Sequence, residues 1–245
     1  MKALLLAAGR GERMRPLTDH CPKPLLKVRG KALIEWHLQA LARAGVHEVV
    51  VNTAWLEEQI VAALGDGSRF GVRISYSMEG RDHGGALETA GGLKKALPLL
   101  ADSAGGEASN TDDCFWSIAA DVFAPEFRFA ATDAQAFARS GQLAQLWMVP
   151  NPPHHPAGDF AIQAGLATHG AASEPRFTWS GIALFRAAFV TELMADLAPG
   201  AKAPLRPFLD RAIVQGRLGA TLYRRPWADV GTPERLATLR AAGTP

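Results

Sequence analysis

The first 26 residues constrain the fold of this chain more than any other segment. An apolar run over residues 3–8 ends abruptly at Gly9 and Gly11, and the sequence from Leu4 to Leu26 reads LLLAAGRGERMRPLTDHCPKPLL. The run has the length and composition of a buried strand. Glycines directly after a strand let backbone N–H groups close around an anion. The pattern therefore predicts a parallel strand that leads into an anion-binding loop.

The loop carries more positive charge than a connecting turn needs, in Arg10, Arg13, Arg15 and Lys23. Two common nucleotide-binding motifs do not fit it. A P-loop has a lysine directly after its second glycine, where this chain has Glu12, and a Rossmann fingerprint has a third glycine where Met14 stands. The second strand of a Rossmann unit also ends in an acidic residue, whereas here it ends in Asn52. The loop is therefore predicted to bind phosphate by another arrangement.

Alternating strand and helix patterns follow the loop. Helices are predicted at residues 32–44, 55–64 and 87–100, and strands at residues 47–53, 72–77 and 115–123. The second half is less regular, with strands at residues 142–149 and 178–185, helices at 187–197 and 206–216, and a terminal helix. This order predicts an α/β fold, a three-layer, Rossmann-like and mostly parallel sheet whose ligands collect at the carboxyl ends of the strands. Residues 101–113, which are small, polar and acidic, are predicted to form an exposed loop.

Composition excludes several classes of protein. With 48% hydrophobic residues in 245, the chain can bury a substantial core. A formal net charge of +2 gives no reason to expect a nucleic-acid partner. No apolar stretch approaches the roughly twenty residues that span a membrane, and the first apolar run is too short for a signal peptide. Cys21 and Cys114 are too few for a disulfide framework. A cytoplasmic protein without a membrane partner is expected.

Ten spaced positions of the opening segment resemble the signature of the sugar-1-phosphate nucleotidyltransferases: Gly9, Gly11, Arg13, Pro16, Leu17, Thr18, Pro22, Lys23, Pro24 and Leu25. The resemblance implies a single nucleotidyltransferase domain over residues 1–245, of the nucleotide-diphospho-sugar transferase type. Residues 1–125 would mainly bind the nucleotide and residues 126–245 mainly the sugar. The implied reaction transfers a nucleoside monophosphate unit from a nucleoside triphosphate to a sugar-1-phosphate and releases pyrophosphate.

The resemblance also implies roles for particular residues. Arg13 would hold the triphosphate and Lys23 would stabilise the charge of the α-phosphate. The segment GGALETAGG, Gly84 to Gly92, resembles the base-recognition loop of the family and the helix that follows it. The expected nucleotide-binding residues are Ala7, Ala8, Gly9, Gly11, Gly85, Ala86, Glu88 and Thr89.

Two aspartates are candidates for a magnesium site. Asp121 and Asp229 each follow a strand-like apolar run, and carboxylates at one edge of a sheet can share a Mg²⁺ ion with phosphate oxygens and water. The DVGTPE motif from Asp229 matches the late metal motif of the family. The first metal motif of the family is usually Asn-Gly-Asp. In this chain Ala119 and Ala120 occupy the two positions before Asp121. The methyl group of Ala120 is expected to crowd the nucleotide, at about 1–3 kcal/mol.

The second half carries the candidate sugar site. Residues 150–160, PNPPHHPAGDF, form a predicted rigid turn because they contain four prolines. The expected sugar-binding residues are Asn151, Asp159, Ser180 and Gly181. His154 and His155 are expected at the surface or in packing, because adjacent side chains of an extended chain point to opposite faces.

Larger members of the family hold the sugar phosphate with a lysine, and none occurs between Lys95 and Lys202. Arg176, Arg186 or backbone donors are expected to replace it. The motifs ETAGG and TWSGIALF resemble a short branch of the family that uses UTP and N-acetylmuramate 1-phosphate.

Other substrates and another class of function stay open. The alternatives within the family are GTP with mannose 1-phosphate, and dTTP or UTP with glucose 1-phosphate. A catalytically weakened sugar-nucleotide binding protein is the alternative from another class, and Ala119 and Ala120 support it. The expected partners are the two small substrates, and a monomer or small homo-oligomer is expected because the chain has no room for the family's β-helix extension.

Overall fold

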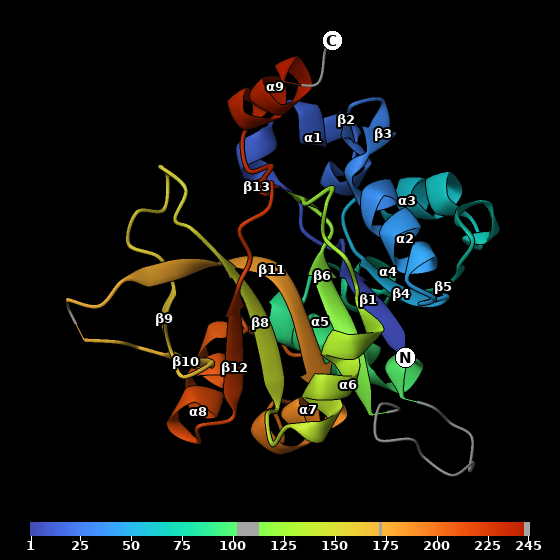
Figure 1. Ribbon diagram of the computed structural model, residues 1–245. Helices are drawn as coiled ribbons and strands as arrows, with labels where there is room; N and C mark the ends of the chain where they lie inside the picture. The colour runs from blue at the N-terminus through green and yellow to red at the C-terminus, as the bar shows by residue number, and fades with distance from the viewer. Residues whose placement is uncertain (102–112, 172, 243–245) are drawn as a thin grey trace.

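The computed structural model describes residues 1–101, 113–171 and 173–242, so nearly all of the loop expected at residues 101–113 lies outside the described residues. A nine-stranded sheet runs through the molecule (Figure 1). Its spatial order is β5 (Arg73–Met78), β4 (Glu48–Thr53), β1 (Lys2–Leu6), β6 (Cys114–Ala119), β11 (Arg176–Arg186), β8 (Ala144–Val149), β12 (Leu218–Leu222), β10 (Leu166–Thr168) and β9 (Phe160–Gln163).

The sheet is mixed, so the expectation of a mostly parallel sheet is wrong. The strands β5, β4, β1 and β6 pair in parallel, and so do β8 and β12. The other five pairings described within this sheet are antiparallel, and β9 pairs back onto the start of β11 so that the last strands curl into a partial barrel. No helix separates β8 from β11. Parallel neighbours need such a crossover and antiparallel neighbours do not.

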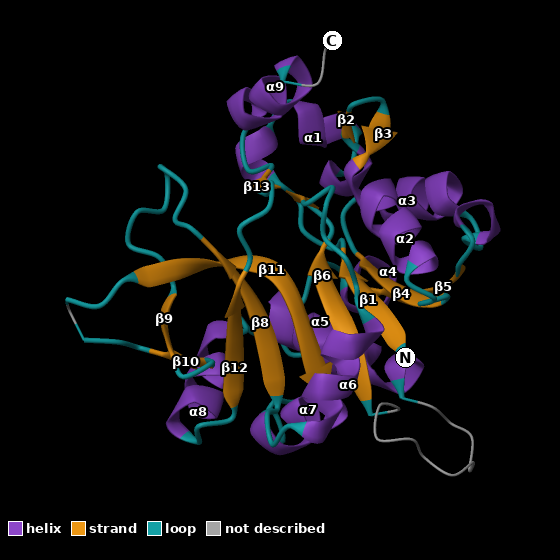
Figure 2. Ribbon diagram, viewed as in Figure 1, coloured by secondary structure: helices purple, strands orange, loops and turns teal. Residues whose placement is uncertain are grey.

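Helices cover both faces of the sheet (Figure 2). Leu5 faces one apolar cluster with α2 (Leu33–Arg43), α3 (Glu57–Leu64) and α6 (Ala131–Arg139), whereas its neighbour Leu4 faces another with α5 (Glu88–Leu100), α7 (Ala187–Leu193) and α8 (Arg206–Val214). Successive strand residues point to opposite faces, which separates the two clusters. No described helix is long and apolar enough to cross a membrane.

The predicted helices and strands lie within a few residues of the observed ones; the helix expected at residues 187–197 begins at Ala187 as predicted but already ends at Leu193. Sequence analysis did not identify α6 or the short strands β9 and β10. The α6 sequence ATDAQAFAR buries two alanines and Phe137, so a single large apolar side chain marks its buried face. Strands of three or four residues likewise carry too few alternations to stand out.

A third apolar cluster lies above the carboxyl ends of the central strands. It joins the opening loop, the hairpin of β2 (Lys27–Val28) and β3 (Lys31–Ala32), the ladder of β7 (Val122–Phe123) with β13 (Ala228–Asp229), and α9 (Pro233–Ala241). Its members are Met14, Leu26, Val28, Leu33, Phe123, Val230 and Leu236. The short helix α1 (Leu17–His20) also lies at this end of the molecule, whereas the short helix α4 (Glu79–His83) lies beside β4 (Figure 1). The cluster fixes the last part of the chain against the first.

One buried histidine links α2 to this end of the sheet. The ring of His37 is 2% exposed, and its Nε2 donates a hydrogen bond to the carbonyl oxygen of Val122 at 2.9 Å. Burial lowers the pKa of His37 from 6.5 to about 4, although the Val122 hydrogen bond and the charge of Asp121 oppose the shift. Between about pH 4 and pH 6.5, therefore, the His37 ring is mainly neutral in the folded protein and mainly protonated in the unfolded chain.

Acid is predicted to destabilise the fold through His37. The contribution of the neutral ring is fully present above pH 6.5 and is lost as the pH falls toward 4, because the unfolded chain then takes up the proton; a shift of this size corresponds to about 3 kcal/mol. Urea unfolding at several pH values will measure the loss. His37→Gln, which retains a donor, should flatten the profile, whereas the exposed control His47→Gln should not. Equal profiles for wild type and His37→Gln would contradict the assignment.

Candidate functional site

The opening loop folds around its two glycines. Strand β1 ends so that the N–H of Ala7 donates to Oδ1 of Asn52 at 2.7 Å. Gly11 has a φ of 67°, and a Cβ there would lie 3.1 Å from Thr18 Cγ2 and 3.3 Å from Lys23 Cβ. Gly9 instead has no other atom near the position of a Cβ. Gly11 is thus required for the turn, whereas Gly9 leaves the backbone open to a ligand.

The four cations of the loop have different environments. Arg10 stacks over the ring of Trp55 at 4.3 Å, and Arg15 pairs with Asp19 at 2.8 Å. Lys23 is 8% exposed, and its Nζ lies 2.5 Å from Oδ2 of Asp121. Arg13 is exposed at the edge of a cavity described below. The two predicted catalytic cations are thus the two that face the candidate site.

A cavity of about 350 Å³, the loop cavity, opens where the carboxyl ends of β1, β4 and β6 meet. It brings together most of the residues predicted to bind the nucleotide. Its lining includes Ala7, Ala8, Gly9, Gly11, Lys23, Ala86, Glu88, Thr89 and Asp121, together with Asn52, Ala119, Trp179 and Gly181. Gly85 is the predicted nucleotide-binding residue that does not line it. The loop cavity therefore has a floor of backbone and small side chains with one buried cation.

A buried hydrogen-bond network, which sequence analysis missed, fixes the start of α5 against this cavity. Asn52 donates from Nδ2 to Oε1 of Glu79 at 2.7 Å, and Oε2 of Glu79 accepts from the N–H of Leu87 at 2.7 Å. Burial raises the pKa of Glu79, although the hydrogen bonds from Leu87 and Asn52 act to lower it. A Cβ on Gly92 would lie 2.7 Å from both Asn52 Nδ2 and Glu79 Oε1. The sequence signal for this network is the polar residue Asn52 at the end of the otherwise apolar HEVVVNT strand.

The structure brings the two candidate metal-binding aspartates to neighbouring strands. β7 and β13 pair antiparallel, with Asp229 opposite Val122, and the N–H of Val230 donates to the backbone oxygen of Asp121 at 3.1 Å. Both aspartates therefore lie at the same end of the sheet as Lys23. Their backbones are adjacent, whereas the Asp121 side chain lines the loop cavity and the Asp229 side chain lines a neighbouring cavity.

A second cavity, the tryptophan cavity, adjoins the first and has a volume of about 300 Å³. Trp179 and Gly181 line both cavities. They lie at a β-bulge of β11, and Gly181 has a φ of 80° that suits such a distortion. The remaining lining is Arg13, Val122, His154, His155, Thr178, Ser180, Trp227 and Asp229. The bulge therefore turns β11 into the partition between two adjacent binding spaces.

The four predicted sugar-binding residues divide into two pairs. Ser180 and Gly181 line the tryptophan cavity. Asn151 and Asp159 lie behind it: Nδ2 of Asn151 donates to two backbone oxygens, and Oδ2 of Asp159 accepts from the N–H of Trp179 at 2.8 Å. The polar atoms of the second pair hold the proline-rich turn and the bulge in place.

The cationic groups near the tryptophan cavity differ from those expected. His154 is exposed and His155 is half-buried, as a surface role predicts, and both also line this cavity, because the turn lacks the alternation of a strand. The guanidinium of Arg186 donates to backbone oxygens at the end of α6, and Nη2 of Arg176 donates to the backbone oxygen of Asp159. Neither arginine lines a cavity described here, so the expectation that either replaces the missing lysine has no support in this geometry.

Ala120 does not crowd the loop cavity. It is fully buried in the apolar cluster beneath the sheet, and its N–H donates to the backbone oxygen of Leu6 at 3.0 Å. Ala119 lines the cavity instead and faces Gly181, where a Cβ would lie 2.9 Å from that of Ala119. The expected clash at Ala120 is therefore wrong, because adjacent residues of a strand face opposite sides.

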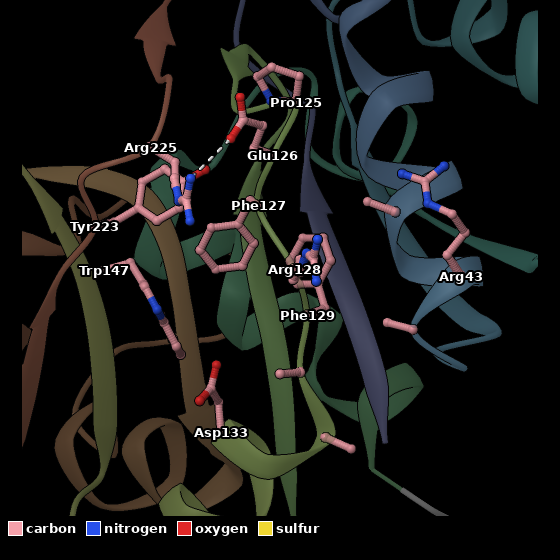
Figure 3. A pocket seen from close by; sticks show the side chains of 14 residues that line it. Arg43, Pro125, Glu126, Phe127, Arg128, Phe129, Asp133, Trp147, Tyr223 and Arg225 are labelled. Atoms are coloured by element: carbon pink, nitrogen blue, oxygen red, sulfur yellow. Dashed lines mark ion pairs between the residues drawn. The ribbon is translucent and has the colours of Figure 1, made fainter.

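A larger cavity, of about 1010 Å³, lies away from these residues (Figure 3). Aromatic side chains of Phe127, Trp147 and Tyr223 line it, and Arg225 approaches Glu126 at 3.9 Å. None of the predicted site residues contributes to its lining. Size alone therefore does not identify the functional site of this molecule.

Comparison with known proteins agrees with the geometry. A profile of the family described as nucleotidyl transferase matches residues 2–165. The chain is 43% identical over 242 residues to N-acetylmuramate alpha-1-phosphate uridylyltransferase of Neisseria meningitidis serogroup B, which covers 98% of this chain and 97% of that protein. It is 32% identical over 241 residues to the enzyme of the same name from Caulobacter vibrioides, across 95% and 92% of the two chains.

The fold also matches a solved structure. A putative glucose-1-phosphate thymidylyltransferase from Bacillus anthracis superposes with a TM-score of 0.80 at 20% identity, over 99% of this chain and 95% of that one. That likeness supports the mixed α/β architecture. The chain belongs to the nucleotidyl transferase family and is a sugar-1-phosphate nucleotidyltransferase.

Proposed function

We propose that this enzyme transfers UMP from UTP to N-acetylmuramate 1-phosphate and releases pyrophosphate. One observation carries the proposal: the 43% identity to a uridylyltransferase of that substrate extends over 98% of the chain and so includes both cavities. Residues 1–125 would mainly bind UTP and residues 126–245 mainly the sugar phosphate. The two adjacent cavities, which share Trp179 and Gly181, suit two substrates that react with one another.

The acceptor is a sugar with two acidic groups, a phosphate and a carboxylate. The tryptophan cavity carries three basic side chains, Arg13, His154 and His155, and one carboxylate, Asp229. Such a set offers donors to both acidic groups of N-acetylmuramate 1-phosphate. A hexose 1-phosphate without a carboxylate would use only part of this set of donors. The number of hydrogen-bond donors in this cavity therefore supports the acidic amino sugar over mannose or glucose 1-phosphate.

The donor set of the two aspartates fits magnesium. Oδ1 of Asp229 is buried and accepts no hydrogen bond, and no group of three or more His, Cys, Asp or Glu side chains gathers as a metal site among the described residues. Mg²⁺ prefers one or two carboxylates and completes its shell with phosphate oxygens and water. Asp121 and Asp229 would hold the ion, whose chemistry is to neutralise charge on the phosphates.

The chain needs to supply position and charge rather than a nucleophile. In the proposed step an oxygen of the sugar phosphate attacks the α-phosphorus of UTP, the bond to the β-phosphate oxygen breaks, and its electron pair leaves with pyrophosphate. A phosphate monoester has its second pKa near about 6, so the attacking oxygen is largely ionised at pH 7 without a general base. Lys23, beside Asp121, would stabilise the charge on the α-phosphate.

Substrate specificity gives the first test. Pyrophosphate release will be measured for four nucleoside triphosphates against N-acetylmuramate, N-acetylglucosamine, glucose and mannose 1-phosphates. Release is expected with UTP and the muramate sugar, and EDTA should abolish it because the phosphates then lose their counter-ion. Preference for GTP with mannose 1-phosphate would contradict the proposal, and binding of UTP without release from any pair would favour a non-catalytic binding protein.

Lys23→Ala should reduce kcat by about a hundredfold or more, because it removes a buried charge aimed at the reacting phosphate. The exposed Lys27→Ala in the same segment is the matched control and should leave kcat unchanged. Melting curves will separate loss of catalysis from loss of fold, since the substitution also leaves Asp121 without its partner. Unchanged turnover in folded Lys23→Ala would exclude the catalytic role.

Glu88 lines the loop cavity in a backbone conformation that favours glycine, with a φ of 59°. If this strain is retained because the carboxylate contacts the nucleotide, Glu88→Gly should keep or raise the stability, by up to about 1 kcal/mol, while it weakens UTP binding. Calorimetric titration of UTP and urea unfolding will measure the two effects. Ala164→Gly, at a φ of 48° in another turn, is the control that should affect stability alone. Undiminished UTP affinity in Glu88→Gly would contradict this role.

A further inference from the structure

Asp229 is held by an arginine that no motif of the sequence analysis included. Nη1 of Arg235 lies 2.5 Å from Oδ2 of Asp229 and also 3.0 Å from Nε2 of His154. Nε2 of His154 lies 3.0 Å from the other carboxylate oxygen, Oδ1, which nevertheless accepts no hydrogen bond. One oxygen of Asp229 is thus engaged by a cation of the chain, and the other keeps its lone pairs unused.

The DVGTPER segment is shaped to hold this guanidinium. A Cβ on Gly231 would lie 2.8 Å from Nη1, 3.1 Å from Cζ and 3.1 Å from Nη2 of Arg235. Gly231 has no left-handed φ, so a side chain here would act on the position of the guanidinium and not on the backbone conformation. Thr232 caps α9, and its Oγ1 accepts from the N–H of Arg235 at 3.4 Å. The backbone of Arg235 is therefore fixed in the first turn of the helix.

We propose that Arg235 is a positioning residue that orients Asp229 for the metal ion, with Oδ2 held by the guanidinium and Oδ1 left as the metal-binding oxygen. This inference rests on the proposed function, in which Asp229 is a magnesium ligand. Hydrogen bonds to a metal-binding carboxylate commonly fix its orientation, and their loss typically lowers metal affinity. Gly231 contributes indirectly, because it leaves the space in which the guanidinium lies.

If Arg235 instead competes with the metal ion, its removal has the opposite effect on metal affinity. A cation that merely occupies the place of the metal would compete with it, and its removal would strengthen metal binding. Lys23 on Asp121 shows that the second aspartate is also paired. The orienting role is favoured at Asp229 because Arg235 engages Oδ2, whereas the nitrogen nearest Oδ1, Nε2 of His154, itself accepts from Arg235. The sign of the change in metal affinity therefore distinguishes the two.

Mn²⁺ binding will test the inference on the complete protein without nucleotide, by the loss of the electron paramagnetic resonance signal of the free ion. Arg235→Gln should raise the Mn²⁺ dissociation constant by about 10- to 100-fold. Gly231→Ala should raise it in the same direction by less, since it displaces the arginine without removing it. Arg139→Gln, on the exposed end of α6, is the matched control. In turnover, the Mg²⁺ concentration for half-maximal rate should rise more than kcat falls.

Each outcome decides the inference. Weaker Mn²⁺ binding in both variants, with melting temperatures near that of wild type, supports it, because a general loss of fold would lower kcat and stability together. Unchanged or tighter Mn²⁺ binding in Arg235→Gln, in an enzyme whose wild type binds Mn²⁺ and releases pyrophosphate, overturns the inference and leaves the proposed function intact. Wild-type protein that neither binds Mn²⁺ nor releases pyrophosphate with any substrate pair overturns both.

Discussion

The two-residue ladder between β7 and β13 is the contact on which the rest of the site depends. Backbone pairing places Asp229 opposite Val122, and the N–H of Val230 reaches the backbone oxygen of Asp121. Two hydrogen-bonded residues cannot hold segments so far apart in the chain by themselves, because closing such a loop costs entropy. The apolar cluster of the opening loop, the β2–β3 hairpin and α9 supplies the burial that stabilises the ladder. Packing at this end of the molecule is thus a condition for the chemistry.

The charges of the site are arranged in pairs before any substrate is present. Lys23 contacts Asp121 and Arg235 contacts Asp229, so two carboxylates and two cations lie in a partly buried region without large net charge. Isolated charges there would be costly, which explains why each has a partner. Binding of a metal ion and a triphosphate adds positive and negative charge together. The arrangement is therefore suited to taking up the two as one unit.

Rigid and strained elements frame the loop cavity. The buried Asn52–Glu79 network holds the start of α5. One carboxylate oxygen of Glu79 accepts from Asn52, and the other accepts from the N–H of Leu87. Next to it Glu88 adopts a left-handed backbone, and on the opposite side the bulge at Gly181 distorts β11. Such local costs persist where the surrounding structure fixes them, and they gather at binding sites. Glu88 lines the loop cavity alone, whereas Gly181 lines both cavities.

The sequence by itself determined the glycine-containing loop after the first strand, the order of most strands and helices, and the two candidate aspartates, because glycine positions, apolar runs and short motifs are local properties of the chain. Only the tertiary structure decided that the sheet is mixed, that Ala120 faces the core, and that His154 and His155 line the tryptophan cavity. Strand direction depends on the connections, and the side that a residue faces depends on register. Arg235 and Gly231 carry no separate signal, since a clamp on Asp229 exists only once α9 has packed against the opening loop.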